Sequence, residues 1–142
     1  MNAAEEVGIP KTNDFNKGNN FGCGYFQVTE RNGLRCSTAV GYLNPVKKNK
    51  NLKIETHCHV QKINFENKKA VSVTYYKGNN SFTVKANKEI ILSAGSIGSP
   101  QILQTSGIGD SQKLKNLGIN TIHELKGVGK NLQDDLMLRP VY

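Results

Sequence analysis

The fold is decided by residues 89–100, which read Glu89-Ile90-Ile91-Leu92-Ser93-Ala94-Gly95-Ser96-Ile97-Gly98-Ser99-Pro100. The apolar run 90–92 is typical of a strand covered on both faces in a parallel α/β sheet. Small residues follow, and then Ser99 as N-cap and Pro100 at the first helical position predict a helix. A strand, a tight turn and a helix N-terminus let the backbone approach an anionic or electron-rich cofactor. Small residues also allow a helix simply to pack tightly on a sheet, and the pattern alone leaves both interpretations open.

Before this stretch, apolar and polar residues alternate, as in strands of a sheet with one solvated face. The alternation runs from Leu52 to Val60 and changes parity before Ile63, which predicts a β-bulge between Val60 and Ile63. Two more alternating segments, 71–75 and 82–86, follow polar turns. Together these segments predict an antiparallel meander of three strands.

Shorter elements are predicted on both sides, because capping and turn residues punctuate the sequence. In order, they are a helix at 2–7, an Asn- and Gly-rich loop at 13–24, a strand at 25–29, a turn at Asn32-Gly33, a helix from Ser37 to about Pro45, a helix from Asp110 or Ser111 to about Leu117, and a strand within 119–125. The helix that starts at Ser99 is expected to stop at Gly107 and Gly109.

The composition is that of a soluble protein, with 142 residues, of which 37% are hydrophobic and 21% charged. No apolar run approaches the roughly 20 residues of a membrane span, so no membrane segment is expected. The first ten residues contain Glu5 and Glu6 and lack the pattern of a secretory signal. A cytoplasmic location is the expectation.

The net charge of +8 raises the alternative of a small basic, β-rich module that binds nucleic acid or another partner. However, only Arg31, Arg35 and Arg139 are arginines among the 19 basic residues, and the charge is spread along the chain. Phosphate and base recognition favours the bidentate arginine fork. A solvated lysine-rich surface is therefore preferred, and no nucleic-acid partner is predicted.

No metal site and no catalytic residue are predicted. The three cysteines have no metal-ligand spacing, and on a strand His57 and His59 would point away from Cys58. The sequence contains no G-x-G-x-x-G, no G-x-S-x-G and no Walker A motif.

A family resemblance becomes specific in the segment that starts at Gly95. Residues 95–109 resemble a signature of the glucose-methanol-choline (GMC) oxidoreductases, which are FAD-dependent alcohol dehydrogenases and oxidases. Further matches lie in family order and cover essentially the whole chain. They are Gly8-Ile9-Pro10, Asp14-Phe15-Asn16, Arg35-Cys36-Ser37-Thr38-Ala39, Tyr42-Leu43-Asn44-Pro45, Asn51-Leu52-Lys53-Ile54, Glu89 to Gly95, and Gly127-Val128-Gly129-Lys130-Asn131-Leu132-Gln133-Asp134.

The resemblance implies a mixed fold, α+β or α/β, that is a central fragment of a larger flavoenzyme. Residues 1–50 would belong to the substrate-binding region, 51–109 to the meander and strand-helix of a Rossmann-like FAD-binding domain, and 110–142 to a further substrate or cap segment. The family's dinucleotide fingerprint and active-site histidine are not in this sequence, so Met1 would be an internal methionine or a misplaced start. The isolated chain is expected to be inactive and to retain FAD weakly or not at all, because the helix N-terminus that holds the pyrophosphate would lie in the missing fingerprint.

The implied cofactor is FAD, and the implied substrate is a small primary alcohol such as choline. Val60 matches a family valine whose backbone bonds the adenine of FAD. Ser93, Ala94 and Gly95 match a strand end beside the cofactor, and Ser96 matches the helix start beyond it. Residues 131–134 match a loop near the flavin, where the family usually continues with His and this chain has Asp135. The alcohol itself, the electron acceptor and the choice between oxidase and dehydrogenase stay open.

Overall fold

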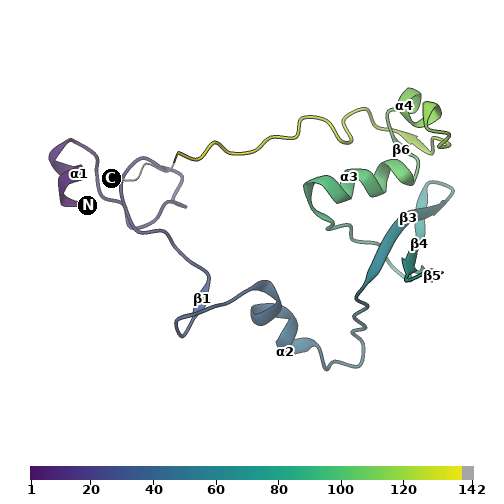
Figure 1. The fold of residues 1–142 in the computed structure, drawn as a ribbon, viewed down its shortest axis with the longest axis horizontal. Coiled ribbons are helices and arrows are strands. Elements are labelled where there is room, and N and C mark those ends of the chain that lie inside the picture. Colours follow the sequence, from purple (N-terminus) through teal and green to yellow (C-terminus); the bar gives the residue numbers. More distant parts are fainter. Residues whose placement is uncertain (139–142) are drawn as a thin grey trace. The chain divides into compact units, whose positions relative to one another are not determined.

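The computed structural model describes residues 1–138, coloured from purple to yellow in Figure 1. It divides into two compact units, Met1–Ile54 and the remainder of the described chain from Glu55. The last residues of the predicted 110–142 segment, 139–142, lie outside the described part. Helices and strands both contribute, so the mixed fold class is confirmed.

The first unit contains only short elements: α1 (Asn2–Glu6), β1 (Glu30–Arg31), β2 (Leu34–Arg35), a π-helical turn η1 (Ala39–Leu43) and α2 (Asn44–Val46). The predicted hairpin turn is confirmed, because Asn32 and Gly33 have φ of 53° and 73° between β1 and β2. These left-handed angles match a type I′ turn, for which Asn-Gly is the preferred pair.

Two predictions for this unit need correction. The strand at 25–29 does not form, since within residues 1–138 no strand pairs with it, and Tyr25 and Phe26 are each 85% exposed. A strand without a hydrogen-bonding neighbour is not stable in water. The helix from Ser37 forms, but its first turn is the π-helical η1. The Val40 N–H donates to Ser37 Oγ at 3.4 Å, as a capping serine would accept it.

The predicted meander is confirmed as β3 (Cys58–Glu66), β4 (Lys69–Lys77) and β5 (Asn80–Lys85), antiparallel in the order β3-β4-β5. The bulge is confirmed too, because the register of β3 against β4 shifts between Val60 and Lys62. However, β3 starts at Cys58 rather than at Leu52.

The two faces of the meander differ in polarity. On one face Ile63 lies opposite Val73, which lies opposite Val84 on β5, and Ile63 is 7% exposed. On the other face Asn64 Nδ2 donates to Ser72 Oγ and to Thr74 Oγ1, both at 2.9 Å. This amphipathic pattern is the one that the alternating sequence predicts.

The start of the stretch 89–100 does not form the strand predicted for it. Residues 90–92 form no strand within the described chain, and Ile91 is 78% exposed. A buried parallel strand needs neighbours on both sides, and residues 1–138 offer it none.

The helix α3 (Gly95–Thr105) begins earlier than predicted, so Pro100 lies inside it and Ser99 is not its N-cap. Instead the Ala94 N–H donates to Ser99 Oγ at 3.0 Å. The serine thus satisfies a backbone group at the residue before the helix, which begins about one turn earlier than predicted. The ending is confirmed, because Gly107 follows α3 with φ of +86°.

After α3 the chain forms β6 (Ile108–Gly109), α4 (Ser111–Asn116) and β7 (His123–Glu124). As predicted, Asp110 caps α4. The predicted strand within 119–125 shrinks to β7, which pairs in parallel with β6. Leu114 of α4, 1% exposed, is the most deeply buried of the large hydrophobic side chains described.

Candidate functional site

A groove lies between the start of β3 and the helix α3, which pack side by side (Figure 1). We call it the β3–α3 groove; its volume is about 380 Å³. It is lined by Cys58, His59, Val60, Gln61, Ala94, Gly98, Gln101, Ile102 and Thr105. No lysine, arginine, aspartate or glutamate lines it, and its lining consists of apolar side chains, two amides, a hydroxyl, the thiol of Cys58 and the imidazole of His59.

The structure brings together two of the five residues predicted to contact the cofactor. Val60 and Ala94 line the β3–α3 groove, although they are 34 residues apart in the sequence. Ser96 lines a neighbouring pocket on another side of α3. Ser93 and Gly95 flank Ala94 but line neither cavity. The contact of these five residues with FAD stays a prediction.

Two hydroxyls at the end of α3 hold the helix against β3. Thr105 Oγ1 donates to the carbonyl of Gln61 at 2.8 Å, and the N–H of Ile63 donates to Ser106 Oγ at 2.8 Å. Because β3 is an edge strand, these backbone groups have no further strand to bond, and the helix end takes that role. Neither residue was predicted from the sequence. The only signal was a Thr-Ser pair directly before the helix-ending Gly107.

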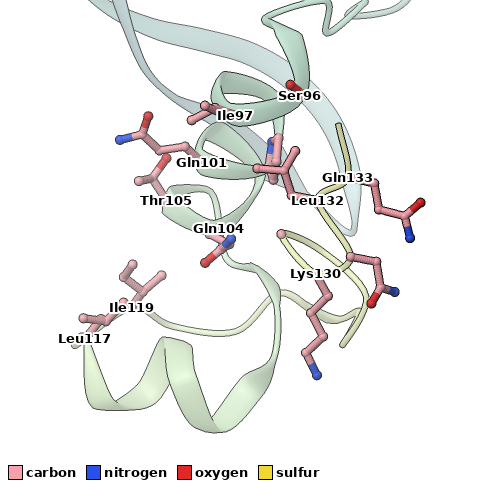
Figure 2. A pocket seen from close by; sticks show the side chains of 13 residues that line it. Ser96, Ile97, Gln101, Gln104, Thr105, Leu117, Ile119, Lys130, Leu132 and Gln133 are labelled. Atoms are coloured by element: carbon pink, nitrogen blue, oxygen red, sulfur yellow. The ribbon is translucent and has the colours of Figure 1, made fainter. Parts of the chain in front are cut away.

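A second pocket of about 590 Å³ lies on α3, opposite the segment 129–133 (Figure 2). Figure 2 shows Gln101 and Gln104 on the helix, with Lys130 and Gln133 on the facing segment. The two sides approach closely, because a Cβ at Gly129 would lie 2.6 Å from Gln104 Nε2. Part of the predicted flavin-side loop 131–134 therefore borders a cavity; its contact with the flavin stays a prediction.

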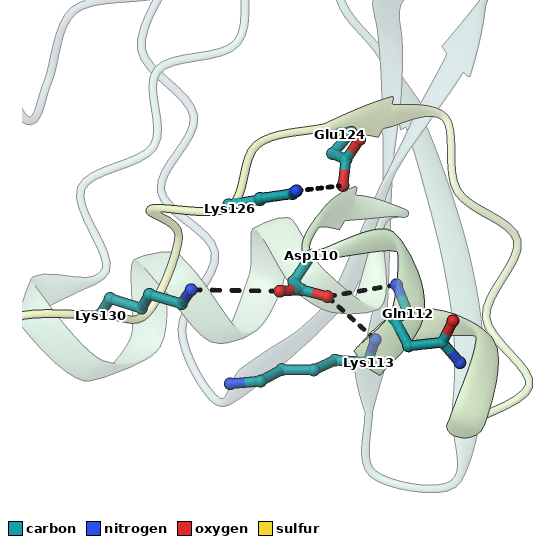
Figure 3. A network of polar contacts seen from close by, with 6 residues as sticks. All are labelled: Asp110, Gln112, Lys113, Glu124, Lys126 and Lys130. Carbon is teal, nitrogen blue, oxygen red and sulfur yellow. Dashed lines mark hydrogen bonds and ion pairs between the residues drawn. The ribbon is translucent and has the colours of Figure 1, made fainter.

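A small polar network fixes this segment to the start of α4 (Figure 3). Asp110 Oδ1 accepts from the N–H groups of Gln112 and Lys113, both at 3.2 Å, and Lys130 Nζ lies 4.0 Å from Asp110 Oδ2. The hydrogen bond from the Lys113 N–H, with a smaller effect from the Lys130 charge, lowers the pKa of Asp110. Nearby, Lys126 pairs with Glu124 at 3.8 Å. One carboxylate thus caps a helix and lies within ion-pair distance of Lys130.

Other kinds of functional site have little support in the described residues. Within 1–138, no three His, Cys, Asp or Glu side chains come close enough to hold a metal ion. No helix in the same range is long and apolar enough to cross a membrane. The pKa of Lys77 is raised by its hydrogen bond to Glu55 at 2.7 Å, but this is an exposed ion pair on the surface of the sheet.

Comparison with known proteins gives the class to which the chain belongs. The family model described as GMC oxidoreductase matches residues 1–137. The chain belongs to the GMC oxidoreductase family.

Its relatives include choline dehydrogenases. The chain is 44% identical over 141 residues to the oxygen-dependent choline dehydrogenase of Pseudomonas putida, covering 97% of this chain and 25% of the relative. It is 49% identical over 107 residues to that of Proteus mirabilis, covering 73% of this chain and 19% of the relative. The chain thus spans about a fifth to a quarter of these relatives.

Solved structures show the same fold. Pyridoxine 4-oxidase from Mesorbium loti matches with a TM-score of 0.80 and 29% identity, over 87% of this chain and 24% of the other. An FAD-dependent oxidoreductase from Chaetomium thermophilum matches with a TM-score of 0.68 and 43% identity, over 70% of this chain and 18% of the other.

Proposed function

We propose that this chain forms part of an FAD-dependent enzyme that oxidises the CH–OH group of a small primary alcohol, with choline as the first substrate to test. The observation that carries the proposal is the 44% identity over 141 residues to a protein named oxygen-dependent choline dehydrogenase. At this identity the supporting segments of the active site are expected to be shared. No observation favours the nucleic-acid alternative, whose only motive was the net charge.

The donor set of the β3–α3 groove fits one part of FAD, its adenine end. Because β3 is an edge strand, its outer side carries backbone N–H and C=O groups; α3 takes the Gln61 C=O and the Ile63 N–H, and we expect others near Val60 to bond the edge of a planar heterocycle. Val60 and Ile102 offer apolar contacts for its faces, and the groove is of a size for a base rather than for a whole dinucleotide. When bound, FAD supplies the hydride acceptor. This chain's own part is to bind and orient the adenine end.

The segments 93–96 and 129–133 are proposed to act differently from the β3–α3 groove. The small residues at 93–96 let the backbone lie close to a cofactor, and Gly95 takes φ of +81° with open space where a side chain would be. The pocket opposite 129–133 has a largely apolar lining that also carries amides and Lys130, groups that donate to oxygen and nitrogen acceptors. No residue of this chain is proposed as a base.

The proposal is tested by exchanging segments. The 141-residue aligned segment of the Pseudomonas putida choline dehydrogenase is replaced by the matching residues of this chain, and bound FAD and choline-dependent oxygen consumption are measured. We expect the chimera to retain both. A chimera with the far-ultraviolet circular dichroism of the parent but without flavin and without choline oxidation would contradict the proposal.

Two controls define the comparison. The parent with the segment deleted sets the background for flavin and for oxygen consumption. The isolated 142-residue chain should give no steady alcohol-dependent dye reduction, because no residue of this chain is assigned as the base. Turnover by the isolated chain would show that this assignment is wrong.

A further inference from the structure

The bulge in β3 lies at the wall of the β3–α3 groove. Val60 pairs with Tyr75 and Lys62 with Thr74, so Gln61 lies between two paired residues and has no partner of its own in the register. A bulged residue interrupts the ladder and changes the direction of the strand. The backbone at Val60 is therefore oriented by whatever holds Gln61.

The carbonyl of Gln61 is held by Thr105 Oγ1 from the last residue of α3, at 2.8 Å. Two residues further along β3, the N–H of Ile63 is held by Ser106 at 2.8 Å. The two contacts differ in setting, because Ser106 is 4% exposed whereas Thr105 is exposed and lines the groove itself. Ser106 is therefore part of the buried core, whereas Thr105 is part of the wall of the β3–α3 groove.

The Thr105 hydroxyl has one proton and two acceptors within reach. The carbonyl of Ile102, one turn back in α3, lies 3.1 Å away, and the Gln61 carbonyl is nearer at 2.8 Å. Neither bond is part of the helix ladder. Removing the hydroxyl therefore leaves α3 with its own backbone hydrogen bonds and releases only the bulge.

We propose that Thr105 is a positioning residue: its hydroxyl holds the Gln61 bulge against α3 and so sets the position of Val60 opposite Ala94 in the β3–α3 groove. The ligand positioned in this way is the adenine end of FAD, and to that extent the inference rests on the proposed function. It adds a residue, outside the five predicted ones, that acts on the cofactor through the backbone of β3.

The test uses the chimeric choline dehydrogenase described under the proposed function, which carries the residues of this chain, prepared without flavin and labelled with nitrogen-15, and FAD is the probe. Thr105→Val keeps the shape of the side chain and removes the hydroxyl, and Thr105→Ser keeps the hydroxyl. Thr83→Val is the matched control, because Thr83 is an exposed threonine of the same sheet whose hydroxyl bonds Thr74 at 3.3 Å. Amide shifts of Val60 and of the bulge are followed while FAD is added.

We expect Thr105→Val to weaken FAD binding about 2- to 10-fold, the factor for loss of one hydrogen bond. Its Gln61 and Lys62 amides should shift before FAD is added. Thr105→Ser should bind as the unchanged chimera does, and so should Thr83→Val. A Thr105→Val chimera with unchanged FAD affinity would overturn the inference and leave the proposed function standing, even if its thermal stability were lower.

The other outcomes are equally decisive. If FAD shifts no amide of the groove in the unchanged chimera, the proposed adenine site fails and the inference fails with it. If Thr83→Val weakens binding as much as Thr105→Val does, the effect is a general loss of sheet stability, and the positioning role is rejected.

Discussion

Gly107 is a position where a single added methyl group is expected to be costly. Its φ is +86°, and a Cβ there would lie 2.5 Å from the carbonyl oxygen of Asn120 and 3.1 Å from Ile122 Cγ1. Its own carbonyl accepts the N–H groups of Ile122 at 2.8 Å and His123 at 3.2 Å. A methyl group at Gly107 therefore pushes away the segment that its carbonyl holds.

Gly118 offers a matched control, because its φ is +71° and a Cβ there would meet nothing within 4 Å. Alanine in the left-handed region costs about 1–2 kcal/mol at either site. At Gly107 two weakened hydrogen bonds add about 0.5–1.5 kcal/mol each. We therefore expect Gly107→Ala to lower the free energy of unfolding by about 2–5 kcal/mol, and Gly118→Ala by about 1–2 kcal/mol.

The two variants are compared by urea unfolding followed by circular dichroism, with amide exchange of Ile122 and His123 as the local readout. Exchange of these two amides should accelerate in Gly107→Ala and stay nearly unchanged in Gly118→Ala. Equal losses of stability in the two variants, with equal exchange rates, would refute the argument from close approach and leave only the backbone conformation as the cause.

Three further predictions concern single residues. Ser106→Ala leaves the buried N–H of Ile63 without its acceptor and should cost about 1–3 kcal/mol by urea unfolding, whereas the exposed Ser81→Ala should change little. Lys68 lies in the β3–β4 turn with φ of +65°, so Lys68→Gly should increase the free energy of unfolding by about 0.5–1 kcal/mol and raise the melting temperature. A lower melting temperature would argue against left-handed strain at this position. The lowered pKa of Asp110 means that its contribution is complete above the unfolded carboxyl pKa and is lost as the pH falls through the folded pKa. Asp110→Asn keeps a capping side chain, so its stability should fall less on acidification than that of the unchanged chain, and parallel acid unfolding curves would contradict this.

Local patterns predicted the elements whose partners are adjacent in the sequence. The meander and its bulge follow from alternation and from the parity change before Ile63, and a hairpin needs only its neighbour along the chain. The Asp110 cap and the Asn32-Gly33 turn follow in the same way, because each depends on a few consecutive residues.

What the sequence could not supply was the information held by distant residues. The run 90–92 has the composition of a buried strand, but a strand forms only where neighbours exist to pair with it. The bonds from Thr105 and Ser106 to β3 join residues 44 and 43 positions apart. The pairing of β6 with β7 has only two residues in each strand, too few to leave a periodic pattern.

The bulge at Gln61 also makes the groove sensitive to chain length. In a regular strand each residue faces the side opposite to its neighbours, so removing one residue turns everything before it by half a revolution. Deleting Gln61 is the exception, because Val60 would still lie opposite Tyr75 and Lys62 opposite Thr74, so the alternation would become regular with Val60 still on the apolar face beside Ile63. A deletion elsewhere between Cys58 and Ile63 would turn the residues before it to the other face, whereas deleting Gln61 would remove only the bend and the carbonyl that Thr105 holds.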